Sequence, residues 1–333
     1  MKILFLIVNL VIYLSLFKFR NFIASFLSLK IKPSKNSFHK SDSYLLGGIL
    51  LIPSFFLTTI YLNYFLDSNL YFNFSIIFLF FILALIDDIF DLKPFIKIFF
   101  CMLILLVIIN FDTSITLPYL NSYYFGLLNF TDNIFIIYFF PILCILLLVN
   151  AFNFIDGING LASLIGLSYF IFVCLKNNHL IEYTFLLIPF LIIFIFINLK
   201  YCIFLGDSGN FLISIILSIF LLKENYYNPL NYFAEEIFLF LLIPGVDMFR
   251  LFIVRIKNKK NPFKGDLNHL HHLLFYKFKL VKTLIIFLCL VNFPIYLFYF
   301  FPKYLTIILI ATFITYSFLV YKLSGNTNKV KKI

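Results

Sequence analysis

The chain has 333 residues, of which 63% are hydrophobic and only 12% are charged, and its formal net charge is +11. Because a soluble globule needs more polar residues to cover its surface, this composition excludes a soluble protein and predicts an integral membrane protein. The positive charge does not indicate a nucleic-acid partner, because cytoplasmic loops rich in Lys and Arg, together with anionic membrane lipids, explain it.

Apolar stretches long enough, or nearly long enough, to cross about 30 Å of hydrocarbon recur along the whole chain. They predict an all-α fold, a polytopic transmembrane helical bundle that forms one domain over residues 1–333. Pro302 between the last two stretches predicts a tight hairpin. The eleven expected spans are residues 3–19, 44–66, 71–86, 95–111, 133–149, 158–175, 181–198, 209–222, 234–254, 283–301 and 303–321.

The basic residues predict the orientation. If successive loops alternate between the two sides, every Lys and Arg falls on one side except Lys2, Lys176, Lys223 and Lys303. Lys and Arg accumulate on the cytoplasmic side of membrane proteins, so an odd number of spans would place the N-terminus outside and the C-terminus in the cytoplasm. The most basic cytoplasmic segment is expected to be a loop over residues 255–282.

Acidic residues gather on the same predicted side, in the motifs DDIFD, NFIDG and FLGDSGN and in the basic loop. Carboxylates at a membrane border are unfavourable unless they bind a partner or do chemistry. A helix cap or an ion pair with Lys explains any single one, but four such motifs on one side indicate a functional site. The residues are Asp87, Asp88, Asp91, Asp156, Asp207 and Asp266.

The types of residue in these motifs favour phosphate chemistry. Asp87 and Asp88 repel each other, so both stay ionised only near a cation, and oxygen ligands favour Mg²⁺, or Mn²⁺, over zinc. Asp207 lies between glycines just before an expected span, where the first amides of a helix point at an anion. The sequence therefore predicts a phosphate-bearing substrate with Mg²⁺.

Three histidines, His269, His271 and His272, fall within four residues of the basic loop, in the motif HLHH. A zinc site would need a fourth ligand, and this spacing is unusual for zinc ligands. The basic surroundings favour binding of phosphate oxygens, while a loop that only rests on lipid headgroups stays an alternative.

Five motifs in order, HKSDSYLLGG, DDIFD, NAFNFIDGINGLA, NLKYCIFLGDSG and PFKGDLNHLHHLL, resemble the polyprenyl-phosphate N-acetylhexosamine-1-phosphate transferases of glycosyltransferase family 4. DDIFD and HLHH are more similar to the branch that uses UDP-GlcNAc and undecaprenyl phosphate than to phospho-MurNAc-pentapeptide translocase. The resemblance implies transfer of HexNAc-1-phosphate from a UDP-HexNAc to undecaprenyl phosphate, with release of UMP. It further implies an active site on the cytoplasmic face of a bacterial inner membrane and a role in starting an envelope polysaccharide such as O-antigen.

The resemblance also implies roles for single residues. Asp207 would bind Mg²⁺, Asp87, Asp88 and Asp156 would be catalytic, and Lys93, Lys97 and Arg255 would hold the acceptor phosphate. The substrate-binding residues would be Asn150, Asn153, Asn159, Asn198, Asp91, Arg255, Asp266, His269, His271 and His272.

The chain departs from the family at a few positions. Asn159 stands where a second Asp is usual, and Asn210 stands where a Ser is usual. A polytopic transporter or flippase of a phosphorylated lipid or anion is the alternative function, and Asp247 is the intramembrane carboxylate that such a protein would use. The sequence leaves open whether the chain forms a homodimer.

Overall fold

The computed structural model describes residues 1–31, 43–66, 71–201, 203–261 and 267–324. Within these residues the chain forms a helical bundle. The helices are α1 (Lys2–Lys18), α2 (Arg20–Phe26), α3 (Gly47–Leu66), α4 (Tyr71–Phe90), α5 (Pro94–Phe111), α6 (Ile134–Ile155), α7 (Leu161–Lys176), α8 (Leu180–Thr184), α9 (Leu187–Tyr201), α10 (Gly206–Tyr227), α11 (Ala234–Lys257), α12 (Leu270–Phe300) and α13 (Leu305–Ser324). Each expected apolar stretch coincides largely with one helix, except residues 181–198, which are divided between two helices, α8 and α9.

Seven helices of the described residues are long and apolar enough to cross a membrane: α3, α5, α6, α10, α11, α12 and α13. An eighth crossing results if α1 and α2, which meet at a bend of 65°, form one span. Helices α7 and α9 are apolar but shorter, at 16 and 15 residues. The structure therefore confirms a multi-pass helical membrane protein. The number of described helices that are long and apolar enough to cross a membrane is smaller than the eleven crossings expected from the sequence.

Two small sheets accompany the helices of this predominantly helical fold. Strands β1 (Lys30–Ile31), β2 (Ser43–Leu45) and β5 (Ile203–Phe204) form one sheet, in which β2 lies antiparallel to β1 and parallel to β5. Strands β3 (Tyr119–Ser122) and β4 (Gly126–Asn129) form a hairpin. Strands of two to four residues are too short to show an alternating pattern in the sequence, which is why they were missed.

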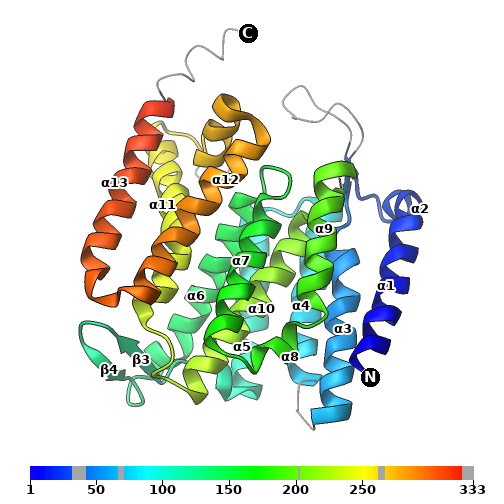
Figure 1. The fold of residues 1–333 in the computed structure, drawn as a ribbon, viewed down its shortest axis with the longest axis horizontal. Helices are drawn as coiled ribbons and strands as arrows, with labels where there is room; N and C mark the ends of the chain where they lie inside the picture. Colours follow the sequence, from blue (N-terminus) through cyan, green and yellow to red (C-terminus); the bar gives the residue numbers. More distant parts are fainter. Residues whose placement is uncertain (32–42, 67–70, 202, 262–266, 325–333) are drawn as a thin grey trace.

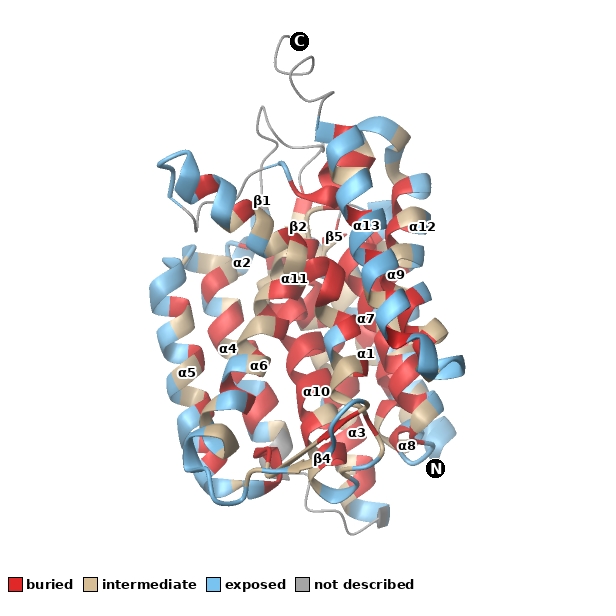
Figure 2. Ribbon diagram, turned by 90° about the vertical axis from the view of Figure 1, so that its left-hand side faces the viewer, coloured by how far each residue is buried: buried red, intermediate tan, exposed pale blue. Residues whose placement is uncertain are grey.

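Helix α10 lies at the centre of the bundle, where it packs against α3, α4, α6 and α7. Most residues of α10 are buried, including its polar residues Ser208, Asn210, Ser214 and Ser218, so neighbouring helices enclose it on all sides (Figure 2). The start of α10 carries Asp207, so the most enclosed helix of the bundle positions one of the predicted site residues.

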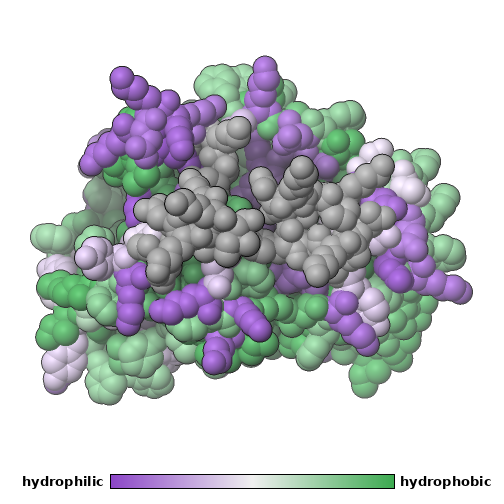
Figure 3. Space-filling view, turned by 90° about the horizontal axis from the view of Figure 1, so that it is seen from above, coloured by the Kyte–Doolittle hydropathy of each residue, from purple (hydrophilic) through white to green (hydrophobic). Residues whose placement is uncertain are grey.

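The two ends of the bundle differ in character. Helix α1 begins at one end and α13 ends at the other (Figure 1), as an odd number of crossings requires. Hydrophilic residues gather on the face at which α13 ends, and apolar residues surround them (Figure 3). The acidic motifs lie at this end, because α4 and α6 finish there and α10 begins there.

The segment expected to be a basic loop over residues 255–282 is largely helical. Helix α11 continues to Lys257, and α12 begins at Leu270, directly after the first histidine of HLHH. A break at Lys279, whose φ is +61°, separates the first part of α12 from the rest. The first part is helical because Leu270 and Leu274 are buried in the core, which the basic composition of the segment concealed.

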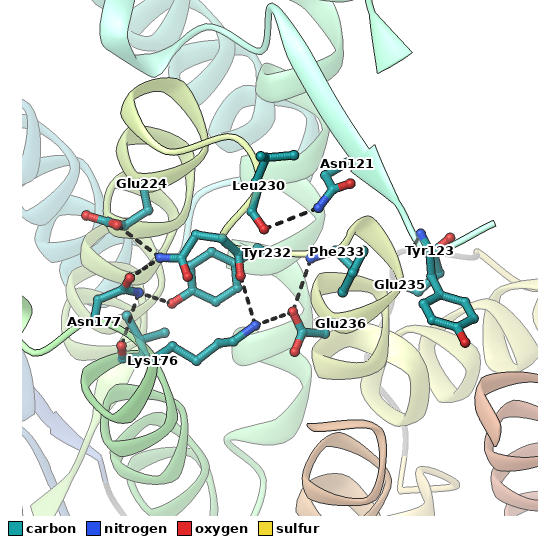
Figure 4. Close-up of polar contacts among 12 residues, drawn as sticks. Asn121, Tyr123, Lys176, Asn177, Glu224, Leu230, Tyr232, Phe233, Glu235 and Glu236 are labelled. Carbon is teal, nitrogen blue, oxygen red and sulfur yellow. Dashed lines mark hydrogen bonds and ion pairs between the residues drawn. The ribbon is translucent and has the colours of Figure 1, made fainter. Parts of the chain in front are cut away.

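A polar group that we call the distal cluster joins α7 and α11 at the opposite end of the bundle. It consists of Lys176, Asn177, Asn231, Tyr232 and Glu236 (Figure 4). The Lys176 ammonium donates to the Glu236 carboxylate at 2.6 Å and to the Asn231 carbonyl at 2.9 Å. The Asn177 amide contacts the Tyr232 hydroxyl at 2.5 Å. Each of these side chains thus has its own partner.

Candidate active site

Asp87 lies in the last turn of α4 and is 8% exposed. One carboxylate oxygen accepts the Leu92 backbone N–H at 2.8 Å, and the other lies 2.6 Å from the Lys97 ammonium on α5. Asp91 ends α4 in a left-handed conformation with φ +51°, which Asp adopts more readily than most residues. The turn between α4 and α5 therefore brings Lys97 back onto Asp87.

The same ammonium contacts Asp207 at the start of α10. Asn153 on α6 lies against both groups: its amide nitrogen donates to Asp207 Oδ1 at 2.6 Å and its oxygen accepts from Lys97 Nζ at 2.9 Å, in the amide orientation that satisfies both. We call Asp87, Lys97, Asn153 and Asp207 the site cluster. Two carboxylates share one ammonium there, so the cluster has an unbalanced negative charge, which favours binding of a further cation.

Asp88 faces away from Lys97 and caps α10. Its carboxylate accepts the backbone N–H groups of Asp207 at 2.8 Å and Ser208 at 3.0 Å. Gly206 allows this approach, because it has φ +71° and a Cβ there would lie 2.9 Å from Asp88 Oδ2. The anion predicted at the start of α10 is thus the carboxylate of Asp88, and this corrects the expectation that the helix amides point at the substrate.

Asp156 follows the last residue of α6 and accepts a hydrogen bond from the Asn210 amide at 2.8 Å. The pKa of Asp156 is raised to about 7, mainly by burial and to a smaller extent by the nearby charge of Asp88, against the lowering effect of the hydrogen bond from Asn210. Asn210, which departs from the usual Ser of the family, therefore has a defined role as the partner of Asp156.

The glycines of the motif LLGG let α3 approach the start of α10. Strand β2 runs parallel to β5, which places Gly47 against the backbone of Leu205 and Gly48 against Ser208. A Cβ at either glycine would lie 2.5 Å from these neighbours. The close contact fixes the start of α10, and with it the position of Asp207. His39 of the same motif lies outside the described residues.

The histidines of HLHH pack beneath the connection between α6 and α7. A Cβ at Gly157 would lie 2.6 Å from His271 Nε2 and 2.6 Å from His272 Cε1. The His269 ring lies 5.4 Å from the Phe154 ring and is stacked 5.5 Å from the His271 ring, measured between centroids. The motifs NFIDG and HLHH, more than 100 residues apart in sequence, thus form one packed unit.

Asn159 and Asn198 lie near the same connection. The Asn198 amide nitrogen donates to the Ile203 carbonyl at 2.6 Å and so joins α9 to β5. The side-chain oxygens of both residues are buried and have no hydrogen-bond partner within the described part of the chain. Buried acceptors without donors are rare, so these two oxygens are candidates for contact with a polar ligand.

A cavity of about 480 Å³ opens beside the site cluster, between α4, α5, α6 and α11. The cavity has two parts along α6. Asn150 and Asn153 line one part, and Leu143, Leu146 and Leu147 line the other. The remaining polar lining residues are Asp87, Asp91, Lys97, Asp207 and Arg255, and the apolar ones include Met248, Phe249 and Phe252. One cavity thus combines a charged end with an apolar wall.

The cavity brings together seven of the residues predicted from the sequence: Asp87, Asp91, Lys97, Asn150, Asn153, Asp207 and Arg255. The structure places others behind this surface: Asp88 and Asp156 support α10, and Asn198 supports β5. The three histidines form a neighbouring group that touches the cavity wall through Phe154. Asp266 lies outside the described residues.

Asp247 is the residue whose role the sequence did not reveal. It is 3% exposed on α11, and its carboxylate contacts His269, Arg250 and Tyr316. One signal in the sequence could have revealed this role. Asp247 precedes Arg250 by three residues in an apolar stretch, and a charge buried in such a stretch requires a partner.

Comparison with known proteins places these observations in context. Residues 70–225 match the family model described as glycosyl transferase family 4, and this range contains the whole site cluster. The chain is 34% identical to undecaprenyl-phosphate alpha-N-acetylglucosaminyl 1-phosphate transferase of Thermotoga maritima. The aligned region has 256 residues and covers 77% of this chain and 76% of the relative. The chain is 26% identical over 285 residues to the protein of the same name from Escherichia coli O157:H7, covering 80% of this chain and 75% of that protein.

Proposed function

Because this chain belongs to glycosyl transferase family 4, we propose that it transfers a HexNAc-1-phosphate from a UDP-sugar to undecaprenyl phosphate and releases UMP. The relatives carry the name of this reaction with N-acetylglucosamine as the sugar, and the motif order predicted the same family. The observation that carries the proposal is the cavity in which two carboxylates and one ammonium lie at the end of an apolar wall.

The donor atoms of the site cluster fit a hard divalent cation, Mg²⁺ or Mn²⁺. No group of three or more His, Cys, Asp and Glu among the described residues could hold a metal ion. Asp87, Asp207 and the Asn153 oxygen converge on the Lys97 ammonium, so these oxygens already face one cation and a divalent cation would take its place or lie beside it. Mg²⁺ is commonly held in this way, by one or two carboxylates, waters and substrate phosphates. We therefore assign the cation to Asp207 and Asp87.

A bound cation would stabilise the negative charge that develops on the diphosphate as UMP leaves. Asp88 and Asp156 do not line the cavity but hold the helix that carries Asp207. Asp88 fixes the start of α10, and Asp156 binds Asn210 about one turn further along. These two residues are positioning residues in this proposal, whereas Asp87 and Asp207 face the reacting phosphates.

The reaction is a phosphoryl transfer. A bond forms between an oxygen of the acceptor phosphate and the phosphorus that carries the sugar, and the bond from this phosphorus to UMP breaks. The second pKa of a phosphate monoester is about 6, so the acceptor is already an anion at neutral pH and does not require a base. Lys97 and Arg255 line the cavity, where their charges oppose those of the phosphates. The protein thus contributes position and charge.

The apolar wall provides the place for the lipid chain of the acceptor. Leu143 and Leu147 on α6 line this cavity and also a second cavity of about 280 Å³, which is almost entirely apolar and extends along α6, α10 and α11. A polyprenyl chain is a long hydrocarbon, and such a chain is stabilised by apolar contact along its length. The two neighbouring cavities offer this contact from the site cluster toward the other end of the bundle.

The histidines and the unpartnered amide oxygens mark the side for the donor. His271 and His272 touch Gly157, and Asn159 and Asn198 lie at the same connection. Imidazole and amide groups bind phosphate, uracil and sugar hydroxyls through hydrogen bonds. We assign the UDP-HexNAc to this side of the cavity and the lipid phosphate to the α5 side.

The charge distribution supports an active site on the cytoplasmic face of the bacterial inner membrane. The hydrophilic face at which α13 ends receives the basic last turns of α9 and α11, with Lys200, Arg255 and Lys257. Basic residues of membrane proteins accumulate on the cytoplasmic side, where UDP-sugars are made available.

The proposal is tested with the purified protein in detergent, undecaprenyl phosphate, Mg²⁺ and a panel of UDP-HexNAc donors, with UMP release and lipid-linked sugar diphosphate as readouts. We expect product formation that stops in EDTA and in Asp207→Ala. Asp132→Ala, which changes an exposed aspartate in the turn before α6, is the matched control and should remain active. The proposal is wrong if folded protein that binds UDP releases no UMP with any donor.

A further inference from the structure

Asp247 uses both carboxylate oxygens to join three segments of the chain. Oδ1 accepts the Arg250 guanidinium at 2.8 Å and the Tyr316 hydroxyl of α13 at 2.8 Å. Oδ2 accepts the backbone N–H of Leu270 at 3.0 Å and lies 2.9 Å from His269 Nδ1. A carboxylate buried to this degree requires such partners, and four groups from α11, α12 and α13 supply them.

These contacts fix the start of α12. The first N–H groups of a helix have no partner within the helix, and Asp247 accepts the first of them, that of Leu270. Arg250 adds a second attachment, because its guanidinium also donates to the Asn268 carbonyl at 2.7 Å. The helix that carries HLHH therefore begins at a position set by α11.

The contact to His269 also decides which ring nitrogen carries the proton. A carboxylate accepts hydrogen bonds, so the nitrogen that faces Asp247, Nδ1, is the protonated one. His269 Nε2 then remains as the atom available to a ligand. His269 is only 4% exposed, yet its Nε2 has no hydrogen-bond partner among the described residues. A buried imidazole nitrogen without a partner indicates a place for a polar ligand group.

His269 lies next to the proposed donor side of the site. Its ring contacts Phe154, which lines the cavity directly after Asn153 of the site cluster, and it is stacked on His271. The position of His269 relative to the cavity therefore depends on where α12 begins, and so on Asp247.

We propose that Asp247 is a positioning residue for the transfer reaction: it holds the proton of His269 on Nδ1 and so presents Nε2 to the phosphate or sugar of the donor. This inference rests on the proposed function and on the assignment of the histidines to the donor. Asp247 itself does not touch the substrate. It acts through His269, and this separates it from a residue that only stabilises the bundle.

The first test is a double-mutant cycle on UMP release by the full chain in detergent. The carboxylate that orients a functional histidine at a metal site contributes about ten- to a hundredfold to activity, and we expect Asp247→Asn to lower kcat by an amount of this size. We expect a similar loss in His269→Gln. If Asp247 acts through His269, the double variant is no slower than His269→Gln alone.

Two outcomes of this cycle would overturn the proposal. If the two losses multiply, Asp247 acts by another route, although the histidine assignment stands. If His269→Gln is fully active, the histidine assignment fails, although the transferase reaction measured in the same assay stands. Tyr316→Phe is the matched control, because it removes one donor to Asp247 and leaves the carboxylate facing His269. It should lower kcat less than Asp247→Asn does, because His269 Nδ1 keeps its carboxylate acceptor.

The second test reads the proton directly and does not depend on activity. In protein labelled with ¹⁵N-histidine, the His269 signals, assigned by their loss in His269→Gln, should show a protonated Nδ1. In Asp247→Asn the single acceptor oxygen is engaged by Arg250 and Tyr316, so the amide NH₂ faces the ring and the proton should move to Nε2. An unchanged ¹⁵N pattern in Asp247→Asn, with Tyr316→Phe as reference, would contradict the proposal.

Discussion

The site cluster and the distal cluster lie at opposite ends of the same helices. Helix α11 carries Glu236 in its first turn and Arg255 in its last, roughly 30 Å apart along the axis. In the distal cluster the Lys176 ammonium faces one carboxylate, that of Glu236, and the amides pair with each other and with Tyr232. Asn231 also donates to Glu224 at 3.5 Å, and the other oxygen of Glu224 lies 2.5 Å from His179 Nε2. In the site cluster one ammonium faces two carboxylates beside a cavity of about 480 Å³.

This difference shows how a membrane protein uses charge in two ways. Where the charges balance and each donor has an acceptor, a polar group joins helices and stabilises the bundle. Where carboxylates outnumber cations beside a cavity, the protein alone does not neutralise them, so a metal ion and phosphates complete the arrangement. Side chains of the same type thus stabilise the fold at one end and serve the reaction at the other.

The largest effect is expected when the distal pair is broken. Lys176→Met leaves Glu236, which is 2% exposed, without its cation, and removing one partner of a buried ion pair destabilises a protein by about 3–5 kcal/mol. Denaturant unfolding in detergent should show this loss, while UMP release per folded molecule stays unchanged. The variant Lys176→Met with Glu236→Leu should recover most of the stability. If Lys176→Met lost activity but kept its full stability, the distal cluster would serve the reaction, and the difference between the two clusters would not hold.

The opposite result is expected at Asp207. Asp207→Asn removes a charge that faces the reacting phosphates, and the loss of one such group lowers kcat by about a hundred- to a thousandfold. The free energy of unfolding should be unchanged or higher, because the variant removes the repulsion between Asp87 and Asp207. UMP release and unfolding of the same preparation measure both quantities. A variant that is unstable but active would show that Asp207 is structural.

A smaller effect is expected where HLHH packs on the α6–α7 connection. Gly157→Ala places a methyl group 2.6 Å from His271 Nε2, and overfilling a packed site typically destabilises by about 1–3 kcal/mol. The displaced histidines should also lower the affinity for the donor, seen as a raised KM for UDP-HexNAc. Gly245→Ala is the matched control, because a Cβ at this position meets no atom of the described residues within 4 Å, apart from its own helix backbone and chain neighbours. Equal effects of the two changes would argue against the packed unit.

The smallest effect is the pH dependence of stability due to Asp156. Its pKa in the folded protein, about 7, is above its usual value of 3.8, so the folded state binds this proton more tightly than the unfolded state. The resulting stabilisation is fully present below the usual pKa and is lost as the pH rises through about 7, with a slope of at most about 1.4 kcal/mol per pH unit. Unfolding of Asp156→Asn should lack this component between pH 5 and pH 7. An identical pH profile in both proteins would exclude it.

Much of the site followed from the sequence, for physical reasons. Asp87, Asn153 and Asp207 were predicted because carboxylates and amides at the ends of apolar stretches are unfavourable without a role, and the comparisons confirm the family that their motifs indicated. The resemblance to the family implied catalytic roles for Asp88 and Asp156. The structure shows their carboxylates bound to the backbone of α10 and to Asn210, a distinction that residue type and spacing do not contain.

The sequence by itself determined that this is a helical membrane protein with its acidic motifs and most of its basic residues on one side, because the length of an apolar stretch and the side of a charge are local properties. Only the tertiary structure decided which carboxylates share Lys97, which cap α10, and that Asp247 holds His269. Asp87 and Asp207 are 120 residues apart. Their distance is set by the packing of α4, α5 and α6 around α10, and no local pattern records how four helices pack.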